Sequence, residues 1–214
     1  REDAAGRRGD RVTGAQRDVP IAPATLTKGV SPTQAPVGET VRYTLTTTIP
    51  ANANYYFADL SDSLPAGVEY VAGSAHVVFA GGPTIADEPR VSGSVAAGQN
   101  LVWSVEDAAP ISTSTSQRTI RITYDAKIRD TVKSAAPTNT AVFSWNTNPG
   151  DNDPATRQKT LNASAIVTIQ NPNLTVQKLV KPLGAADGAY AAAKTGNPDQ
   201  GFTYRVRVTN TGNV

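Results

Sequence analysis

Residues 119–128 read TIRITYDAKI, and this stretch decides the fold class. Every second residue is apolar or aromatic, and the residues between them are polar or charged. The first set is Ile120, Ile122, Tyr124, Ala126 and Ile128. Side chains point to opposite faces along a β-strand, so residues of one set share a face. The pattern therefore predicts a strand with one face in a core and the other in water.

The same alternation recurs along the chain. Residues 40–49 (TVRYTLTTTI) and 101–105 (LVWSV) place apolar side chains on one parity, and Gly and Pro separate such segments. No amphipathic helix of useful length is found, and the AADGAYAAAK run near residues 185–194 is predicted to be a loop insertion. Seven to ten short strands favour an all-β, antiparallel sandwich over repeated βαβ units.

Composition narrows the function classes. The chain has 214 residues, a net charge of +2, no Cys and no Met. The charge is too small to indicate nucleic-acid binding. Without thiols there is neither a disulfide framework nor a thiolate metal site. We expect an exported bacterial surface protein without membrane insertion in this segment, since no apolar run approaches roughly 18 residues.

The chain divides into three parts. Residues 1–20 are expected to be an extended polar arm or linker, and residues 21–170 a complete sandwich. Residues 171–214 begin a second, truncated repeat, because TLTKGVSP around Lys28 returns as LTVQKLVKP around Lys178. Tyr43 likewise returns as Tyr204. Two strands cannot bury a core alone, so further chain from the same protein or from a neighbour is expected to complete the repeat.

Three polar residues interrupt the apolar strand faces. Lys28, Asp62 and Asn139 each share parity with apolar neighbours, which predicts that an amine, a carboxyl and a carboxamide are buried together. Burying unpaired polar groups costs several kcal/mol. We therefore hypothesise a spontaneous bond between the Lys28 amine and the Asn139 side chain, promoted by Asp62. Each residue also has a structural alternative. Lys28 could protect an edge strand from aggregation, Asp62 could cap a turn, and Asn139 could form a hydrogen bond to a loop.

An ordered series of segments carries a family resemblance. These segments are TKGVSPTQAPVGETVRYTLTTTIPA, LSDSLPAGVEYVAGSA, WSV, RTIRITYDAKI and TNTAVFSW, within residues 25–145. They resemble the isopeptide-forming fimbrial and surface-adhesin domains of bacteria, which are immunoglobulin-like sandwiches of the collagen-adhesin and pilin-shaft type. The resemblance implies that Lys28 and Asn139 are the bond partners and Asp62 the promoting acid. Asp59 is an alternative acid, and Asn162 a second candidate acceptor.

The chemistry follows from burial. A buried lysine favours its neutral, nucleophilic form, and a buried acid can stay protonated and polarise the Asn139 carbonyl. The reaction occurs once per domain, so we do not expect an enzyme in the usual sense, and no cofactor is implied. The function expected is a stalk or shaft module of a cell-surface fibre, pilus or adhesin. Its partners would be neighbouring repeat domains or subunits.

Two other functions stay open. One is an adhesin head that holds a glycan or host protein on exposed aromatics such as Tyr55 and Tyr56, and the other is a non-catalytic accessory domain of a secreted enzyme.

Asp151 and Asp153 are weak metal candidates, because the later Gly and Glu of a calcium loop are absent. His76 is the single histidine, so a zinc site or a Ser-His-Asp triad is nearly excluded.

Overall fold

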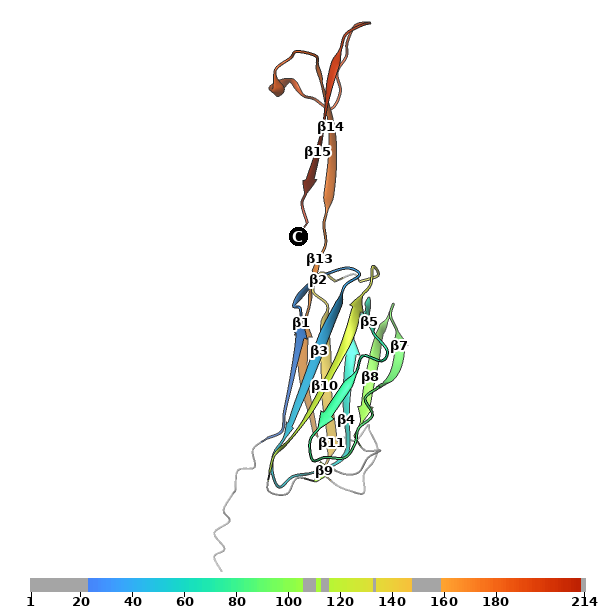
Figure 1. The fold of residues 1–214 in the computed structure, drawn as a ribbon, viewed down its shortest axis with the longest axis vertical. Helices are drawn as coiled ribbons and strands as arrows, with labels where there is room; N and C mark the ends of the chain where they lie inside the picture. The colour runs from blue at the N-terminus through green and yellow to red at the C-terminus, as the bar shows by residue number, and fades with distance from the viewer. Residues whose placement is uncertain (1–22, 106–110, 113–115, 133, 148–158, 213–214) are drawn as a thin grey trace, which may run out of the picture.

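The structure is a computed structural model that describes residues 23–105, 111–112, 116–132, 134–147 and 159–212. Strands dominate it, and the prediction of an all-β sandwich is confirmed (Figure 1). The strands are β1 Thr25–Ser31, β2 Gln34–Pro36, β3 Thr40–Ile49, β4 Asn54–Leu64, β5 Val68–Tyr70, β6 His76–Phe79, β7 Arg90–Ser94, β8 Gly98–Ser104, β9 Ile111–Ser112, β10 Arg118–Ile128, β11 Thr138–Asn146, β12 Lys159–Ile166, β13 Thr168–Gln170, β14 Leu174–Pro182 and β15 Phe202–Asn210.

Two antiparallel sheets form the sandwich. The first has the order β1-β3-β10-β5, with β6 also paired to β10. The second has the order β12-β11-β4-β8-β7, with β9 paired to β4. A short parallel pair, β2 with β13, lies at the end from which the chain leaves the sandwich (Figure 1). More strands form than the predicted seven to ten, because several have only two or three residues and show no readable alternation.

The alternation read from the sequence matches the burial of the strands. In β10 the predicted inward residues are fully buried, and in β8 Leu101 and Trp103 are too, at 0 % and 1 % exposure. In β3 the inward set extends to Thr47 and Ile49. The apolar faces of the two sheets meet in one core, as expected for a sandwich whose outer faces contact water.

Strand β4 departs from simple alternation. Tyr55 and Ala58 are both buried although three positions separate them, so the inward parity changes between them. Phe57 lies in this interval with a positive φ of 50°, and the pairing of β4 with β11 shifts register nearby. A bulge of this kind inserts one residue and re-aims the side chains that follow. Asp62 consequently faces the core.

The chain continues beyond the sandwich as a hairpin. Strands β14 and β15 pair only with each other among the named strands of the described chain, and they project from one end of the sandwich (Figure 1). Their connection holds the 3₁₀ turn η3, Asp187–Ala189, so the AADGAYAAAK run is a loop insertion as predicted. No described helix is long and apolar enough to cross a membrane.

Candidate functional site

The two sheets contribute facing residues to one buried polar cluster. Lys28 lies in the middle of β1, opposite Leu45 of β3, in the first sheet. Asp62 of β4 lies opposite Ala141 of β11 in the second sheet, and Asn139 is two residues before Ala141 on the same face. The structure thus brings together all three polar residues singled out in the sequence.

A fourth residue connects them. The Tyr124 hydroxyl, from β10, donates to Asp62 Oδ2 at 2.7 Å and accepts from Asn139 Nδ2 at 2.8 Å. Lys28 Nζ donates to the same Oδ2 atom of Asp62. The alternation of β10 predicted that Tyr124 faces inward, but sequence reasoning gave it no role. The signal was available: a buried tyrosine hydroxyl needs a polar partner.

The cluster is closed to solvent. The side chains of Lys28 and Asp62 have 0 % exposure, and Asn139 is 0 % exposed as a residue. Strand β1 is an edge strand, but its lysine does not point to water, which argues against the edge-protection alternative. Within the described chain, the Oδ1 atoms of Asp62 and Asn139 have no hydrogen-bond partner. Such buried orphan atoms destabilise a resting fold by roughly 1–3 kcal/mol each.

Aromatic rings surround the amine. Lys28 Nζ lies 4.9 Å from the ring centroid of Tyr43 and 5.9 Å from that of Tyr124. The two rings stack at 5.4 Å, and Trp103 packs against Tyr124 at 5.8 Å. This wall keeps water out and lowers the local dielectric, which strengthens every electrostatic interaction in the cluster.

Burial shifts the ionisation of the cluster. It lowers the pKa of Lys28 to about 8, against the opposing attraction of Asp62. It raises the pKa of Asp62, against the stabilising effects of Lys28, Tyr124 and Asn139 on the carboxylate. Burial and then the Asp62 charge hold the pKa of Tyr124 well above its usual value. Both shifts of the Lys–Asp pair move it toward a neutral amine beside a neutral acid.

The alternative residues lie elsewhere. Asp59 is opposite Ser144 on the other face of β4, and Asn162 is exposed on β12, so neither reaches the cluster. His76 is exposed and 3.4 Å from Asp87. Asp151 and Asp153 lie outside the described residues. Among the described residues, no group of three or more His, Cys, Asp or Glu side chains is arranged to hold a metal ion.

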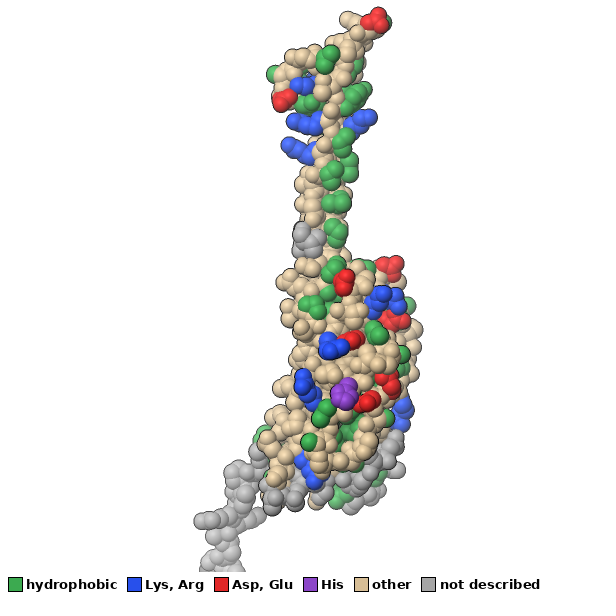
Figure 2. All heavy atoms as spheres, in the orientation of Figure 1, with side chains coloured by type: hydrophobic (Ala, Val, Ile, Leu, Met, Phe, Trp, Pro, Cys, Tyr) green, Lys and Arg blue, Asp and Glu red, His purple; other side chains and the backbone are tan. Residues whose placement is uncertain are grey.

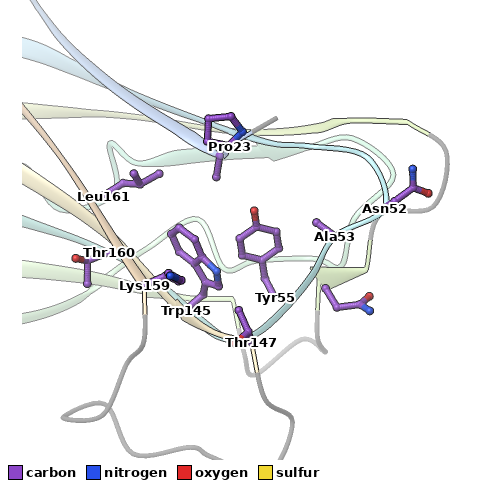
Figure 3. Close-up of a pocket in the computed structure, with 11 residues that line it drawn as sticks. Pro23, Asn52, Ala53, Tyr55, Trp145, Thr147, Lys159, Thr160 and Leu161 are labelled. Carbon is purple, nitrogen blue, oxygen red and sulfur yellow. The ribbon is translucent and has the colours of Figure 1, made fainter. Parts of the chain in front are cut away.

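A separate pocket of about 490 Å³ lies near the start of β4 and the end of β11 (Figure 3). Tyr55 and Trp145 line it, with ring centroids 4.8 Å apart. Both residues are buried, at 6 % and 8 % exposure, whereas Tyr56 is half-buried. The adjacent tyrosines therefore divide between core and surface, and no exposed aromatic pair is formed by them.

Comparisons with known proteins identify the fold. No protein-family model matches the chain, and no curated protein matches it. Among solved structures, a variant of BcpA, the major pilin subunit of Bacillus cereus, matches 89 % of this chain and 60 % of its own, at 13 % identity and a TM-score of 0.52. The pilus backbone protein RrgB of Streptococcus pneumoniae matches 90 % of this chain and 51 % of its own, at 18 % identity and a TM-score of 0.49.

The major pilin SpaD of Corynebacterium diphtheriae matches 78 % of this chain and 40 % of its own, at 13 % identity and a TM-score of 0.49. The chain thus spans between 40 % and 60 % of the length of these three structures. At such identities the likeness concerns the fold alone, and the BcpA match carries it. The chain has the β-sandwich fold of pilin-type domains.

Proposed function

We propose that the chain is a structural stalk module of a bacterial cell-surface fibre or pilus, stabilised by an intramolecular Lys28–Asn139 isopeptide bond. One observation carries the proposal: an amine, an acid and a carboxamide converge from both sheets in a solvent-free core. A fold shared with a major pilin supports it further.

The cluster provides what bond formation requires. Transfer of the Lys28 proton to Asp62 leaves a neutral amine, whose lone pair attacks Asn139 Cγ while the carbonyl electron pair moves to Oδ1. Collapse of this intermediate expels Nδ2, which takes up a proton and leaves as ammonia. Holding the amine and the carboxamide side by side accelerates the reaction without an external catalyst, since well-oriented groups reach effective molarities of about 10⁵ M or more. The domain modifies itself once and has no external substrate.

The position of the bond suits a load-bearing module. It would join β1 of the first sheet to β11 of the second and close a loop of 111 residues (139 − 28). If it acts like a disulfide, it stabilises the domain by about 4–5 kcal/mol. The described chain enters β1 at one end of the sandwich and leaves after β13 at the other (Figure 1). Tension along the chain would therefore reach the cross-link before it could extend the strands between.

Intact-mass measurement tests the proposal. The native chain should be lighter than its calculated mass by one ammonia, and a Lys28→Ala variant should have its full calculated mass. Lys178→Ala is the matched control and should keep the deficit, because Lys178 stands outside the cluster. A native chain at full mass would exclude the bond, and fragment spectra locate it between positions 28 and 139.

A second candidate function, a ligand-binding head, rests on the pocket beside Tyr55 and Trp145 (Figure 3). The packed rings of these residues are poorly suited to stacking on a sugar, since Trp145 stacks on Phe143 and Tyr55 packs against both at a tilt. Oligosaccharide titration followed by the fluorescence of Trp145, with Trp103 replaced by Phe, separates the candidates. A saturable change in Trp145 fluorescence would favour the ligand-binding head. An unchanged fluorescence would favour the stalk module.

A further inference from the structure

The departing nitrogen of Asn139 needs a proton, and the route by which that proton arrives is open. An amide nitrogen must gain a proton to leave as ammonia, and the cluster is closed to solvent. The hydrogen-bond partner of Asn139 Nδ2 is the Tyr124 hydroxyl, at 2.8 Å. That hydroxyl also contacts Asp62 Oδ2 at 2.7 Å. The Tyr124 hydroxyl therefore lies between the Asp62 carboxyl, which can hold a proton, and the leaving nitrogen of Asn139.

We propose that Tyr124 is a catalytic proton relay that carries the Asp62 proton to the departing nitrogen of Asn139. The inference rests on the proposed isopeptide function and adds a residue to it. Tyr124 touches the leaving atom and a carboxyl oxygen, as a relay requires. A hydroxyl can accept one proton and donate another at the same time.

The protons balance in this scheme. Before attack, the amine is neutral and Asp62 holds one proton on Oδ2. When Nζ bonds to Cγ, Nδ2 becomes an amine with a free lone pair. The Tyr124 hydroxyl, which donates to Asp62 and accepts from Nδ2 in the resting cluster, then reverses both hydrogen bonds: it gives its proton to Nδ2 and takes the Asp62 proton. Asp62 accepts the surplus proton of Nζ at the same Oδ2, which Lys28 already contacts. Ammonia leaves, and both Tyr124 and Asp62 end in their starting states.

The environment selects a concerted transfer. Burial is the main cause that keeps the pKa of Tyr124 well above normal, so a free phenolate is strongly disfavoured. Giving and receiving a proton in one step avoids that charge. Direct transfer from Asp62 is the rival route, since Asn139 also lies close enough to Asp62 to lower its pKa.

Tyr124→Phe separates the two routes, because it removes the hydroxyl and keeps the ring. Tyr70→Phe is the matched control: its hydroxyl also donates to a carboxylate at 2.7 Å, but that carboxylate is Glu88, away from the reacting atoms. The full chain is made by cell-free synthesis, samples are quenched in acid at intervals, and intact mass gives the bonded fraction.

The relay predicts that Tyr124→Phe slows ammonia loss by about 10²-fold or more, while Tyr70→Phe reacts at the native rate. A native rate in Tyr124→Phe would overturn the relay and leave the isopeptide proposal intact. A native chain that never loses ammonia would overturn both. Near-UV circular dichroism establishes that each variant is folded.

If Tyr124→Phe does not fold, difluorotyrosine at position 124 keeps the ring and the hydroxyl but changes its acidity. The relay predicts a rate change of several-fold for this replacement and none for the same replacement at position 70. Equal rates at both positions would overturn the relay.

Discussion

Two strand pairs of this chain have the same local structure in different surroundings. In β1–β3, Tyr43 lies opposite Val30, two residues after Lys28. In β14–β15, Tyr204 lies opposite Val180, two residues after Lys178. The lysine nitrogen rests over the tyrosine ring in both, at 4.9 Å for Lys28 and Tyr43 and at 4.7 Å for Lys178 and Tyr204. The sequence similarity between the two strand pairs therefore extends to their register and to this side-chain contact.

The surroundings differ. The second sheet covers β1–β3, so Tyr43 is fully buried, whereas Tyr204 is 61 % exposed. In the hairpin, apolar side chains such as Val176 and Val206 form an uncovered row (Figure 2). Strand pairing alone thus supplies a lysine over a ring. The second sheet supplies what the proposed reaction requires, namely exclusion of water, an acid and a carboxamide.

The largest expected difference in stability is between removing the carboxylate beside Lys28 in the sandwich and removing the carboxylate beside Lys181 in the hairpin. Asp62 pairs with Lys28 in the core, while Asp187 pairs with Lys181 at 2.8 Å with its side chain 86 % exposed. Asp62→Ala should destabilise the fold by at least about 4 kcal/mol, since it would abolish the proposed cross-link and leaves the buried Lys28 amine without its partner. Guanidinium denaturation measures this, and intact mass should show no ammonia loss.

Asp187→Ala is the control for that experiment. Its unfolding midpoint should match that of the native chain, because a solvated ion pair contributes little. Equal midpoints for the two variants would mean that the core pair is no more important than the surface pair, and the comparison would fail.

The aromatic rings should show the next largest difference. Tyr43→Ala removes a fully buried ring and should cost about 3–5 kcal/mol. Tyr204→Ala removes an exposed ring and should stay within about 0.5 kcal/mol. Both are measured by urea denaturation in a Lys28→Ala background, in which the proposed cross-link could not form and mask the change. A large loss in Tyr204→Ala would show that another surface covers the hairpin in solution.

Much of the site was predictable because strand periodicity is a local property. The parity of Lys28 with Leu26 and Val30, and of Asn139 with Ala141, already placed both side chains inward. Alternation also placed Asp62, and not Asp59, on the face of Leu60, as the structure has them. These assignments need nothing beyond a period of two.

What could not be predicted depends on contacts across the core. The bulge at Phe57 changes parity within β4, and no apolar pattern shows where it falls. The hydrogen bond from the Tyr124 hydroxyl to Asp62 joins residues that are 62 positions apart and lie in different sheets. Its existence depends on how the two sheets are placed against each other, which the periodicity of either strand leaves undetermined.

The smallest effect expected is a pH dependence of the unreacted cluster, made accessible by Asn139→Leu. The pKa of Lys28 is about 8 in the folded domain, below its ordinary value of 10.5. Between these values the unfolded chain binds more protons than the folded one, so stability should rise with pH. From pH 8 to 9.5 the gain should be about 1.5 kcal/mol. The raised pKa of Asp62 acts oppositely, in a lower window that begins at 3.8.

Urea denaturation across this range measures the gain, and unfolded tyrosines, whose pKa is about 10, begin to ionise at its upper end. Adding Lys28→Met to the Asn139→Leu chain should abolish the rise, and adding Lys178→Met should preserve it. A flat profile in the Asn139→Leu chain would show that the Lys28 amine stays charged after folding. The difference between the two lysines would then be one of exposure only, and attack on Asn139 would lack its neutral nucleophile.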